Sequence, residues 1–417
     1  MDDARYQIED VKAREILDSR GIPTVEVDIE AGGEVFTASV PSGTSKGKRE
    51  ALELRDGGLR YQGMGVSKAV NNVNTLISQK LRFRDVTMQK DIDDLLIKLD
   101  GTENKSNLGA NALLATSLAV CRAAASVQKK PLWKWISELS RRKPALPDPC
   151  ILVMEGGSHG KGDLEIQEFM IVPEAKSFKE KLRISTEFYF KLGTILEKKY
   201  GRTSANTGLE GAFSPLIEDT EEALDIIAQA AKKLKIKNKV KIILDVAASG
   251  FCQKGKYFFE GEILNSEELK NFYLKICKKY PIFAIEDPFN QDDWEGFKEL
   301  KSVLREKVTI IGDDLLTTNI GRIKEAADKR SCNGLVLKPN QVGTLSEAIE
   351  AGKEAISLGW EVFVKHRSGE TKDDFISDLA CGLGASYIMA GAPTRGERVT
   401  KYNRLLKIEE ELTKFIA

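Results

Sequence analysis

The sequence lacks an excess of charge of either sign. Its 417 residues include 63 Lys and Arg and 63 Asp and Glu, so the formal net charge at pH 7 is zero. Proteins that hold nucleic acid or an anionic membrane surface need a positive field, which this composition does not supply. We therefore expect neither nucleic acid nor a membrane as a partner, and any anionic ligand needs a local site.

The chain also lacks a targeting segment, a long apolar run and paired cysteines. No basic stretch followed by an apolar one occurs near its start. The longest apolar run, 112–125, contains Arg122 and is shorter than the ~20 residues that a membrane helix needs. Its six cysteines are scattered singly, so neither a zinc site nor a disulfide framework is indicated. These absences predict a cytoplasmic protein with reduced core thiols.

What is present suffices for two domains. The chain length accommodates a barrel of roughly 250 residues beside a smaller domain. Residues 8–40 alternate as strands do, with a turn at Gly32 and Gly33, and residues 91–127 have helical spacing. The proline-rich segment 143–149 favours a connection between domains. The predicted domains are an N-terminal α+β capping domain, 1–138, and a C-terminal barrel, 139–417.

Five short apolar runs in the second half each end in a polar residue. Amphipathic stretches at 266–279 and 344–358 lie between them. Strands that alternate with helices predict an α/β fold of the parallel (β/α)8 type, whose active site lies at the carboxyl ends of the strands. The five runs are 240–244 before Asp245, 282–285 before Glu286, 308–312 before Asp313, 334–337 before Lys338, and 361–365 before His366.

The polar residues at these strand ends predict a metal site and a base. Three of them are carboxylates, which repel one another unless a cation lies among them, and an all-oxygen ligand set favours Mg²⁺. Each carboxylate taken alone could instead be a helix cap or a solvated loop residue. Lys338 follows, where a neighbouring metal would depress its pKa and leave an amine to act as a base. Arg367 with Ser368 is suited to holding a phosphate.

Ten short motifs, in order over nearly the whole chain, resemble the enolase family. Each motif alone is weakly specific, and their common order carries the resemblance. The motifs are REILDSRG (14–21), VPSG (40–43), EALELRD (50–56), GGSH (156–159), QEFM (167–170), AIEDPF (284–289), GDD (312–314), KPNQVGT (338–344), HRSGET (366–371) and KYNRLLKIEEEL (401–412).

The resemblance implies a glycolytic homodimer that dehydrates 2-phosphoglycerate to phosphoenolpyruvate. It assigns Lys338 as the base that removes the proton, and it assigns Ser45, in the mobile lid loop, to a second Mg²⁺ that arrives with the substrate. The first Mg²⁺ would be bound by Asp245, Glu286 and Asp313. The remaining implied site residues are Glu210 and Glu168 where hydroxide leaves, and His159 and His366 near the substrate. Arg367 and Ser368 would bind the phosphate, and Gln167 and Ser42 would also bind the substrate.

The sequence departs from the family pattern around this implied site. The last barrel strand of the family ends in a Lys that helps to bind the substrate carboxylate, and here that position is Met389. Leu209 replaces an Asp, Glu155 an Asn, and Lys365 a Ser, while Lys46 follows Ser45 in the lid where the family has Thr. Loss of one charged contact typically costs about 3 to 4 kcal/mol. Our hypothesis is that Lys46 replaces the missing Lys.

Three functions are compatible with this pattern. The first is enolase activity. The second is an enolase-like dehydratase acting on another phosphorylated or phosphonylated hydroxy acid, which the apolar Met389 and Leu209 favour. The third is a catalytically silent binding or structural paralogue, against which the retained Lys338, Glu210 and three carboxylates argue.

Overall fold

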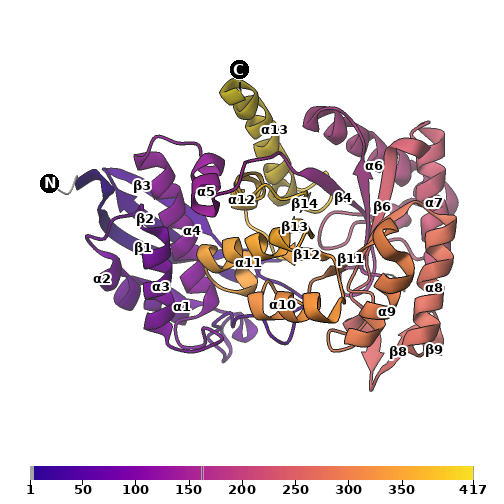
Figure 1. The fold of residues 1–417 in the computed structure, drawn as a ribbon, viewed down its shortest axis with the longest axis horizontal. Coiled ribbons are helices and arrows are strands. Elements are labelled where there is room, and N and C mark those ends of the chain that lie inside the picture. Colours follow the sequence, from indigo (N-terminus) through magenta and orange to yellow (C-terminus); the bar gives the residue numbers. More distant parts are fainter. Residues whose placement is uncertain (1–3, 161, 163, 417) are drawn as a thin grey trace.

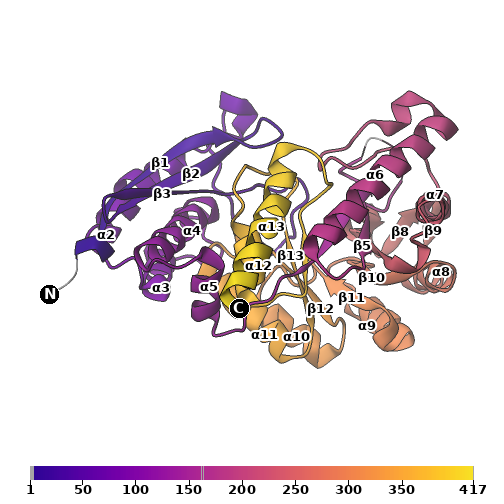
Figure 2. The same ribbon diagram turned by 90° about the horizontal axis from the view of Figure 1, so that it is seen from above.

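The computed structural model describes residues 4–160, 162 and 164–416. The elements before residue 141 lie on one side of the molecule, and the helices α6 to α9 lie on the other (Figure 1). Seen from above, α11, α12 and α13 lie between these two parts (Figure 2). Both views therefore support a two-part organisation in which the end of the chain returns to the junction.

The N-terminal part is an antiparallel sheet covered by helices. Its three strands pair in chain order, and Gly32 and Gly33 form the predicted turn with φ angles of 61° and 76°, which favour glycine. Helix α4 packs against the sheet. The elements are β1 (Ile8–Leu17), β2 (Pro23–Ala31), β3 (Glu34–Ser39), α1 (Ser67–Asn72), α2 (Ser78–Leu81), α3 (Gln89–Asp100), α4 (Ala110–Val127) and α5 (Leu132–Ser140).

Helix α4 contains the apolar run of the sequence. By length and composition it could span a membrane, but 83% of it is buried inside the protein. The one charged side chain in the run, Arg122, donates to Asp373 at 2.7 Å and to Asp374 at 3.0 Å, both from the barrel part. The apolar run is therefore a core helix that also joins the two parts.

The second part is a closed barrel of eight strands, as predicted. Its strand order is β10-β11-β12-β13-β14-β4-β5-β6. The five predicted strands are confirmed as β6 (Val240–Asp245), β10 (Ile282–Glu286), β11 (Thr309–Gly312), β12 (Gly334–Leu337) and β13 (Glu361–Lys365), and the others are β4 (Asp148–Glu155), β5 (Glu168–Pro173) and β14 (Tyr387–Met389). Strand β4 begins at Asp148, so the predicted connection 143–149 ends two residues too late to exclude strand residues.

One expectation about the barrel was wrong, because its strands are not all parallel. Strand β5 runs antiparallel to β4 and to β6. Residues 156–167 connect β4 to β5, and those among them that the structure describes form no helix. A connection of this kind closes a hairpin rather than a parallel crossover. The barrel therefore begins with an antiparallel pair.

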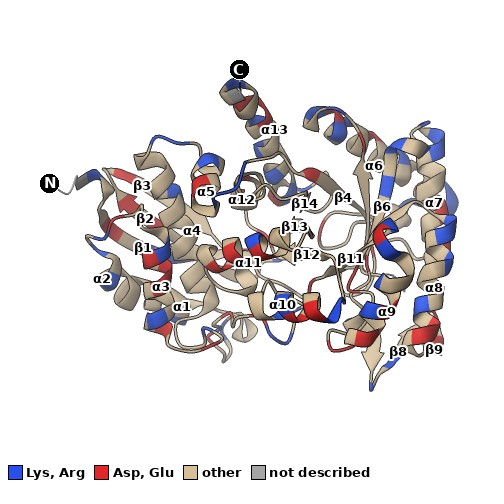
Figure 3. Cartoon of the chain, in the orientation of Figure 1, with Lys and Arg blue, Asp and Glu red and all other residues tan. Residues whose placement is uncertain are grey.

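Helices surround the barrel, and a small sheet lies outside it. The helices are α6 (Phe178–Tyr200), α7 (Thr220–Lys233), α8 (Ser266–Lys279), α9 (Trp294–Leu304), α10 (Ile320–Lys329), α11 (Leu345–Ser357), α12 (Phe375–Leu383) and α13 (Gly396–Ile416), and the small sheet is β7 (Cys252–Gln253), β8 (Lys256–Phe259) and β9 (Glu262–Leu264). Helix α8 has the predicted bounds, and α11 begins after its N-cap Thr344. Lys and Arg residues and Asp and Glu residues both occur along the outer helices (Figure 3).

The six cysteines are free, as expected, but two are not core thiols. Cys121, Cys150, Cys332 and Cys381 are buried, while Cys252 and Cys277 are half-buried. Cys252 lies in the small outer sheet and Cys277 on α8, which explains their partial exposure.

Candidate active site

Four carboxylates lie level with one another on four neighbouring strands of the barrel. Strand pairing places Glu155 opposite Glu168, Glu168 opposite Asp245, and Asp245 opposite Glu286. All four side chains are buried. Neighbouring strands lie about 4.8 Å apart, so this row concentrates negative charge that needs cations to balance it.

The ammonium group of Lys365 lies among three of these carboxylates. Its Nζ donates to Asp245 Oδ2 at 2.6 Å and to the two oxygens of Glu286 at 2.8 and 3.0 Å, and it lies 3.0 Å from Glu168 Oε2. Burial alone would lower the pKa of Lys365, but these carboxylates raise it well above its ordinary value. A buried lysine, noticed in the sequence only as a departure, is thus the central cation of the row.

The predicted base Lys338 pairs with the predicted metal ligand Asp313. The Lys338 ammonium contacts Asp313 Oδ2, and Gln341 Nε2 donates to the other oxygen at 2.8 Å. Burial alone would raise the pKa of Asp313, but Lys338 lowers it to about 2. Burial alone would lower the pKa of Lys338, and Asp313 raises it instead. In this arrangement the pair is ionic and Lys338 holds its proton.

A second cluster joins the two histidines to two glutamates. His366 Nε2 lies 3.0 Å from Glu210 Oε2, and His159 Nδ1 lies 3.5 Å from Glu210 Oε1 and 3.4 Å from Glu168 Oε1. Burial alone would raise the pKa of Glu210, but His366 and then His159 hold it well below its ordinary value. Among the described residues, both nitrogens of His159 and both oxygens of Glu168 are buried without a well-formed hydrogen bond. Such atoms suit a polar ligand.

Two residues that sequence reasoning did not place in the site support this cluster. Glu155 accepts hydrogen bonds from the backbone nitrogens of Glu210, at 3.1 Å, and Ala212, at 2.8 Å. Arg398 of α13 is fully buried and donates to the carbonyl oxygens of Arg367 and Ser368, each at 2.6 Å. Glu155 therefore fixes the loop of Glu210, and Arg398 fixes the loop after β13. Only the glutamate gave a signal in the sequence, as a departure.

The predicted phosphate-binding residues are in contact with the lid loop. Arg367 donates to Glu50 Oε2 at 2.8 Å and to the carbonyl oxygen of Ser45 at 2.8 Å. Ser368 Oγ accepts from the backbone nitrogen of Thr44 at 2.8 Å. Ser42 exchanges two backbone hydrogen bonds with Gly369. The loop thus lies on the barrel mouth. Glu50 binds the Arg367 guanidinium group to which a phosphate would bind.

A pocket of about 370 Å³ opens beside the lid. Ser45, Gln167 and Asp314 are among its lining residues. The predicted pocket residue Gln167 accepts from Ser158 Oγ at 2.8 Å. The structure therefore brings the lid serine and the β4–β5 loop to one cavity at the barrel mouth.

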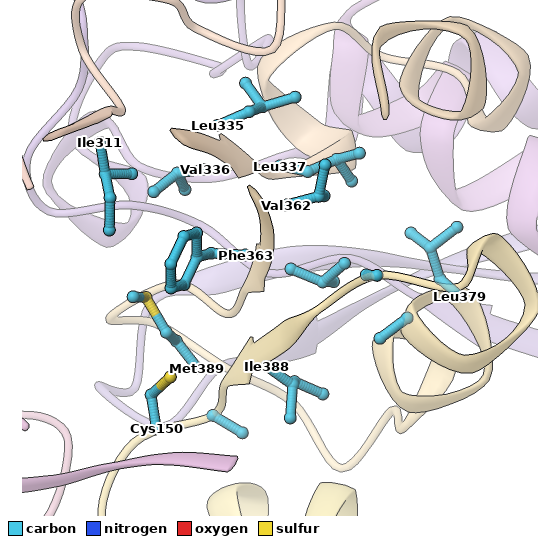
Figure 4. Packing of buried hydrophobic residues seen from close by; sticks show 14 of the residues in the cluster. Cys150, Ile311, Leu335, Val336, Leu337, Val362, Phe363, Leu379, Ile388 and Met389 are labelled. Atoms are coloured by element: carbon cyan, nitrogen blue, oxygen red, sulfur yellow. The ribbon is translucent and has the colours of Figure 1, made fainter. Parts of the chain in front are cut away.

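Lys46 and Met389 lie in different surroundings. The Lys46 side chain is 40% exposed, and its Nζ lies 2.7 Å from Glu53 of the N-terminal part. Met389 is buried among apolar side chains inside the barrel, with Cys150 and Phe363 (Figure 4). Leu209 is half-buried, and its carbonyl oxygen lies 3.4 Å from Arg398. None of the three residues has a contact with the carboxylate row among the hydrogen bonds and ion pairs of the described residues.

Two groups of described side chains bring potential metal ligands within 4.8 Å of one another. They are His159 with Glu168 and Glu210, and Asp287 with Asp313 and Asp314. The second group offers oxygen atoms alone, the donor type that Mg²⁺ prefers. The predicted ligands Asp245, Glu286 and Asp313 come from successive strands of the same barrel end. Asp245, Glu286, Glu168 and Asp313 outnumber the two lysines that contact them, Lys365 and Lys338, so this acidic donor set fits a divalent cation.

The fold and the buried site define a barrel enzyme with an N-terminal capping domain. A family model described as "Enolase, N-terminal domain" matches residues 8–136, and one described as "Enolase, C-terminal TIM barrel domain" matches residues 143–416. The chain belongs to the enolase family.

Similar proteins share this architecture over almost their whole length. The chain is 49% identical to an enolase of Mastigamoeba balamuthi over 420 residues, which covers 97% of this chain and 96% of that protein. It is 48% identical to an enolase of Solanum lycopersicum, covering 97% and 95%, and 46% identical to an enolase of Methanocaldococcus jannaschii, covering 98% and 96%. The resemblance seen in the ten motifs is thereby confirmed.

Proposed function

We propose that this chain dehydrates 2-phosphoglycerate to phosphoenolpyruvate, with Lys338 as the base. Lys338, as the free amine, takes the proton from the carbon beside the carboxylate. The electron pair then forms the carbon–carbon double bond as hydroxide leaves the next carbon, and a proton from the Glu210, Glu168 and His159 cluster converts that hydroxide to water. Arg367 and Ser368 bind the phosphate once Glu50 has released the guanidinium.

This proposal rests on one observation: two buried groups of residues lie around the same mouth of the barrel. One group can act as a base, and the other can act as an acid. Lys338 and Asp313 follow β12 and β11, and His366 follows the adjacent strand β13. Glu168 begins β5 across the barrel, and His159 and Glu210 come from the segments before and after β5. A base and an acid on different sides of one substrate are what a dehydration requires. The membership of the enolase family supports the same assignment.

Two Mg²⁺ ions complete the proposed site. Asp245, Glu286 and Asp313 would hold the first, and Ser45 would hold the second. Such cations would stabilise the negative charge that develops on the substrate, and a cation on Asp313 would remove the charge that keeps the proton on Lys338. Lys365 would share Asp245 and Glu286 with the first ion, so metal binding would be linked to the position of this lysine.

The test is the growth of phosphoenolpyruvate absorbance when the purified protein is mixed with Mg²⁺ and 2-phosphoglycerate. We expect turnover that is lost on Lys338→Ala and kept on Lys353→Ala, since Lys353 is a half-buried residue of α11 that pairs with Glu350. No turnover by the wild-type chain would contradict the proposal. Turnover of another phosphorylated or phosphonylated hydroxy acid would then identify a related dehydratase, and Mg²⁺ binding without any turnover would identify a silent paralogue.

We also infer a homodimer in the cytoplasm, on the strength of the family resemblance. Light scattering on the purified protein should give twice the chain mass, and cell fractionation should place the protein in the cytosolic fraction. A monomer mass at micromolar concentration would contradict the first inference, and recovery with membranes would contradict the second.

A further inference from the structure

Lys365 is a deeply buried lysine whose ammonium lies among carboxylates. The residue is 4% exposed, and within the described part of the chain each hydrogen bond and ion pair of its Nζ is with a carboxylate, from β5, β6 or β10. A buried ammonium is expensive unless several acceptors surround it. The strand β13 therefore delivers one full positive charge to the carboxylate row.

Lys365 and Met389 enter the barrel at the same level from adjacent strands. They are partners in the parallel register of β13 and β14, as are Phe363 and Tyr387 two residues earlier. The Phe363 and Tyr387 rings stack at 4.6 Å with an interplanar angle of 12°, and Phe363 lies with Met389 in the packed interior (Figure 4). Side chains two residues apart on a strand face the same side. Lys365 and Met389 therefore lie one level above this pair and face the same interior.

We propose that Lys365 supplies, from β13, the positive charge that the family motif places at position 389 of β14, and that it does so in competition with the divalent cation for Asp245 and Glu286. The inference rests on the proposed dehydration. It displaces the hypothesis that Lys46 replaces the missing lysine, because Lys46 is bound to Glu53 at a half-exposed site of the N-terminal part. Lys365 instead is already in contact with the carboxylates.

The competition follows from charge. An ammonium 2.6 to 3.0 Å from the oxygens of Asp245 and Glu286 repels a second cation at the same oxygens. Removal of the Lys365 charge should therefore strengthen Mg²⁺ binding while it weakens catalysis. If Lys365 only filled space in the barrel, its removal would not strengthen Mg²⁺ binding while it weakened catalysis.

The experiment uses the full-length protein with four variants. They are Lys365→Met, Met389→Lys, the double variant that exchanges the two residues, and the control Lys353→Met on α11. Each is assayed for turnover of 2-phosphoglycerate at saturating Mg²⁺, for Mg²⁺ affinity by calorimetry, and for folding by circular dichroism.

We expect Lys365→Met to lower turnover about a hundredfold to a thousandfold and to bind Mg²⁺ about tenfold more tightly. Met389→Lys alone places two ammonium groups at one level and should lower turnover as well. The double variant keeps one ammonium there, so its turnover should return to within about tenfold of wild type. The control should match wild type in all three measurements.

A double variant that is unfolded, or that is folded but no better than Lys365→Met, would overturn the proposal, since an ammonium from β14 would then be unable to serve the same carboxylates. Unchanged or weaker Mg²⁺ binding by Lys365→Met would overturn the competition. The calorimetry needs no turnover, so an inactive wild-type chain would refute the proposed dehydration and leave the measurement on Lys365 intact.

Discussion

Glu155 shows how one buried carboxylate can position another residue through the backbone. Because it accepts hydrogen bonds from the backbone nitrogens of Glu210 and Ala212, we expect Glu155→Ala to free the loop of Glu210. Unfolding free energy should fall by about 1 to 3 kcal/mol. Turnover number should fall more than KM rises, since Glu210 acts on the leaving group.

The measurement is steady-state kinetics together with urea unfolding. Glu155→Asn retains a carbonyl acceptor and should recover part of the turnover. Glu295→Ala removes an exposed glutamate that pairs with Lys298 and serves as the control. Equal kinetics for Glu155→Ala and the control would show that the loop holds its position without this carboxylate.

At the residue scale, the sequence placed polar residues at strand ends but did not predict most of the contacts that their side chains make. Lys338 and Asp313 were predicted as neighbours at strand ends, and they form an ion pair. Lys365 was visible only as an unexpected residue, because a lysine has a long flexible side chain and its direction depends on the barrel interior. Arg398, on the terminal helix, gave no signal because nothing in a helical pattern indicates that it packs beneath the loop after β13.

The lid loop depends on a glycine at its closest approach to the barrel. A Cβ added at Gly43 would lie 1.9 Å from an Arg367 nitrogen, and the guanidinium is held by Glu50 and by the carbonyl oxygen of Ser45, so it has little room to yield. We expect Gly43→Ala to displace the loop and to lower kcat/KM about tenfold or more. Melting temperature should stay within about 2 °C, since few core contacts change.

The matched control is Gly396→Ala, where the added methyl group meets no atom within 4 Å. It should leave both kinetics and melting temperature unchanged. Kinetics of Gly43→Ala that match those of this control would show that the loop can take another position over the barrel without loss of function.

Glu53, which pairs with Lys46 of the lid loop, should make the stability of the fold depend on pH. Burial alone would raise the pKa of Glu53, but Lys46 and Arg55 lower it to about 2. A carboxyl whose folded pKa lies below its unfolded value near 4.5 stabilises the fold above pH 4.5, and this contribution disappears as the pH falls towards 2. The shift corresponds to on the order of 3 kcal/mol.

Urea unfolding of the wild type and of Glu53→Gln, measured from pH 7 to pH 2, tests this expectation. The variant should be less stable at pH 7, and the difference should shrink between pH 4.5 and 2. A difference that stays constant over that range would mean that the stability of Glu53 does not depend on its ionisation.

At the scale of elements, strand ends were predictable and strand direction was not. Each of the five predicted strands ends next to its polar residue, and the parallel rule placed those residues together. Glu168 instead is the first residue of β5, because an antiparallel strand reaches the active end of the barrel at its beginning. A search for polar residues after apolar runs therefore misses it, and only the family motif indicated its role.

Asp378 joins three elements that belong to both parts of the molecule. From α12 it accepts hydrogen bonds from the backbone nitrogen of Trp133, at the start of α5, and from Arg404 of α13 at 2.6 and 2.7 Å. Removing one partner of a buried ion pair typically costs about 3 to 5 kcal/mol. We expect Asp378→Ala to lower the unfolding free energy by that amount and to loosen the capping domain.

Calorimetric melting and limited proteolysis between the domains measure the two effects. Asp94→Ala, which removes an exposed partner of Lys90, should cost less than about 1 kcal/mol and leave proteolysis unchanged. Wild-type resistance to protease in Asp378→Ala would show that other contacts, such as Arg122 with Asp373, hold the domains together.

The pairing of Lys365 with Met389 has a consequence for the whole molecule. In a closed barrel every strand has a neighbour on each side. Two side chains from adjacent strands can therefore reach the same place in the interior although they are distant along the chain. In our proposal, position 365 supplies the lysine that the family motif places at its ring neighbour, position 389. A position-by-position comparison records two departures there, whereas these two positions together still supply one lysine to the ring.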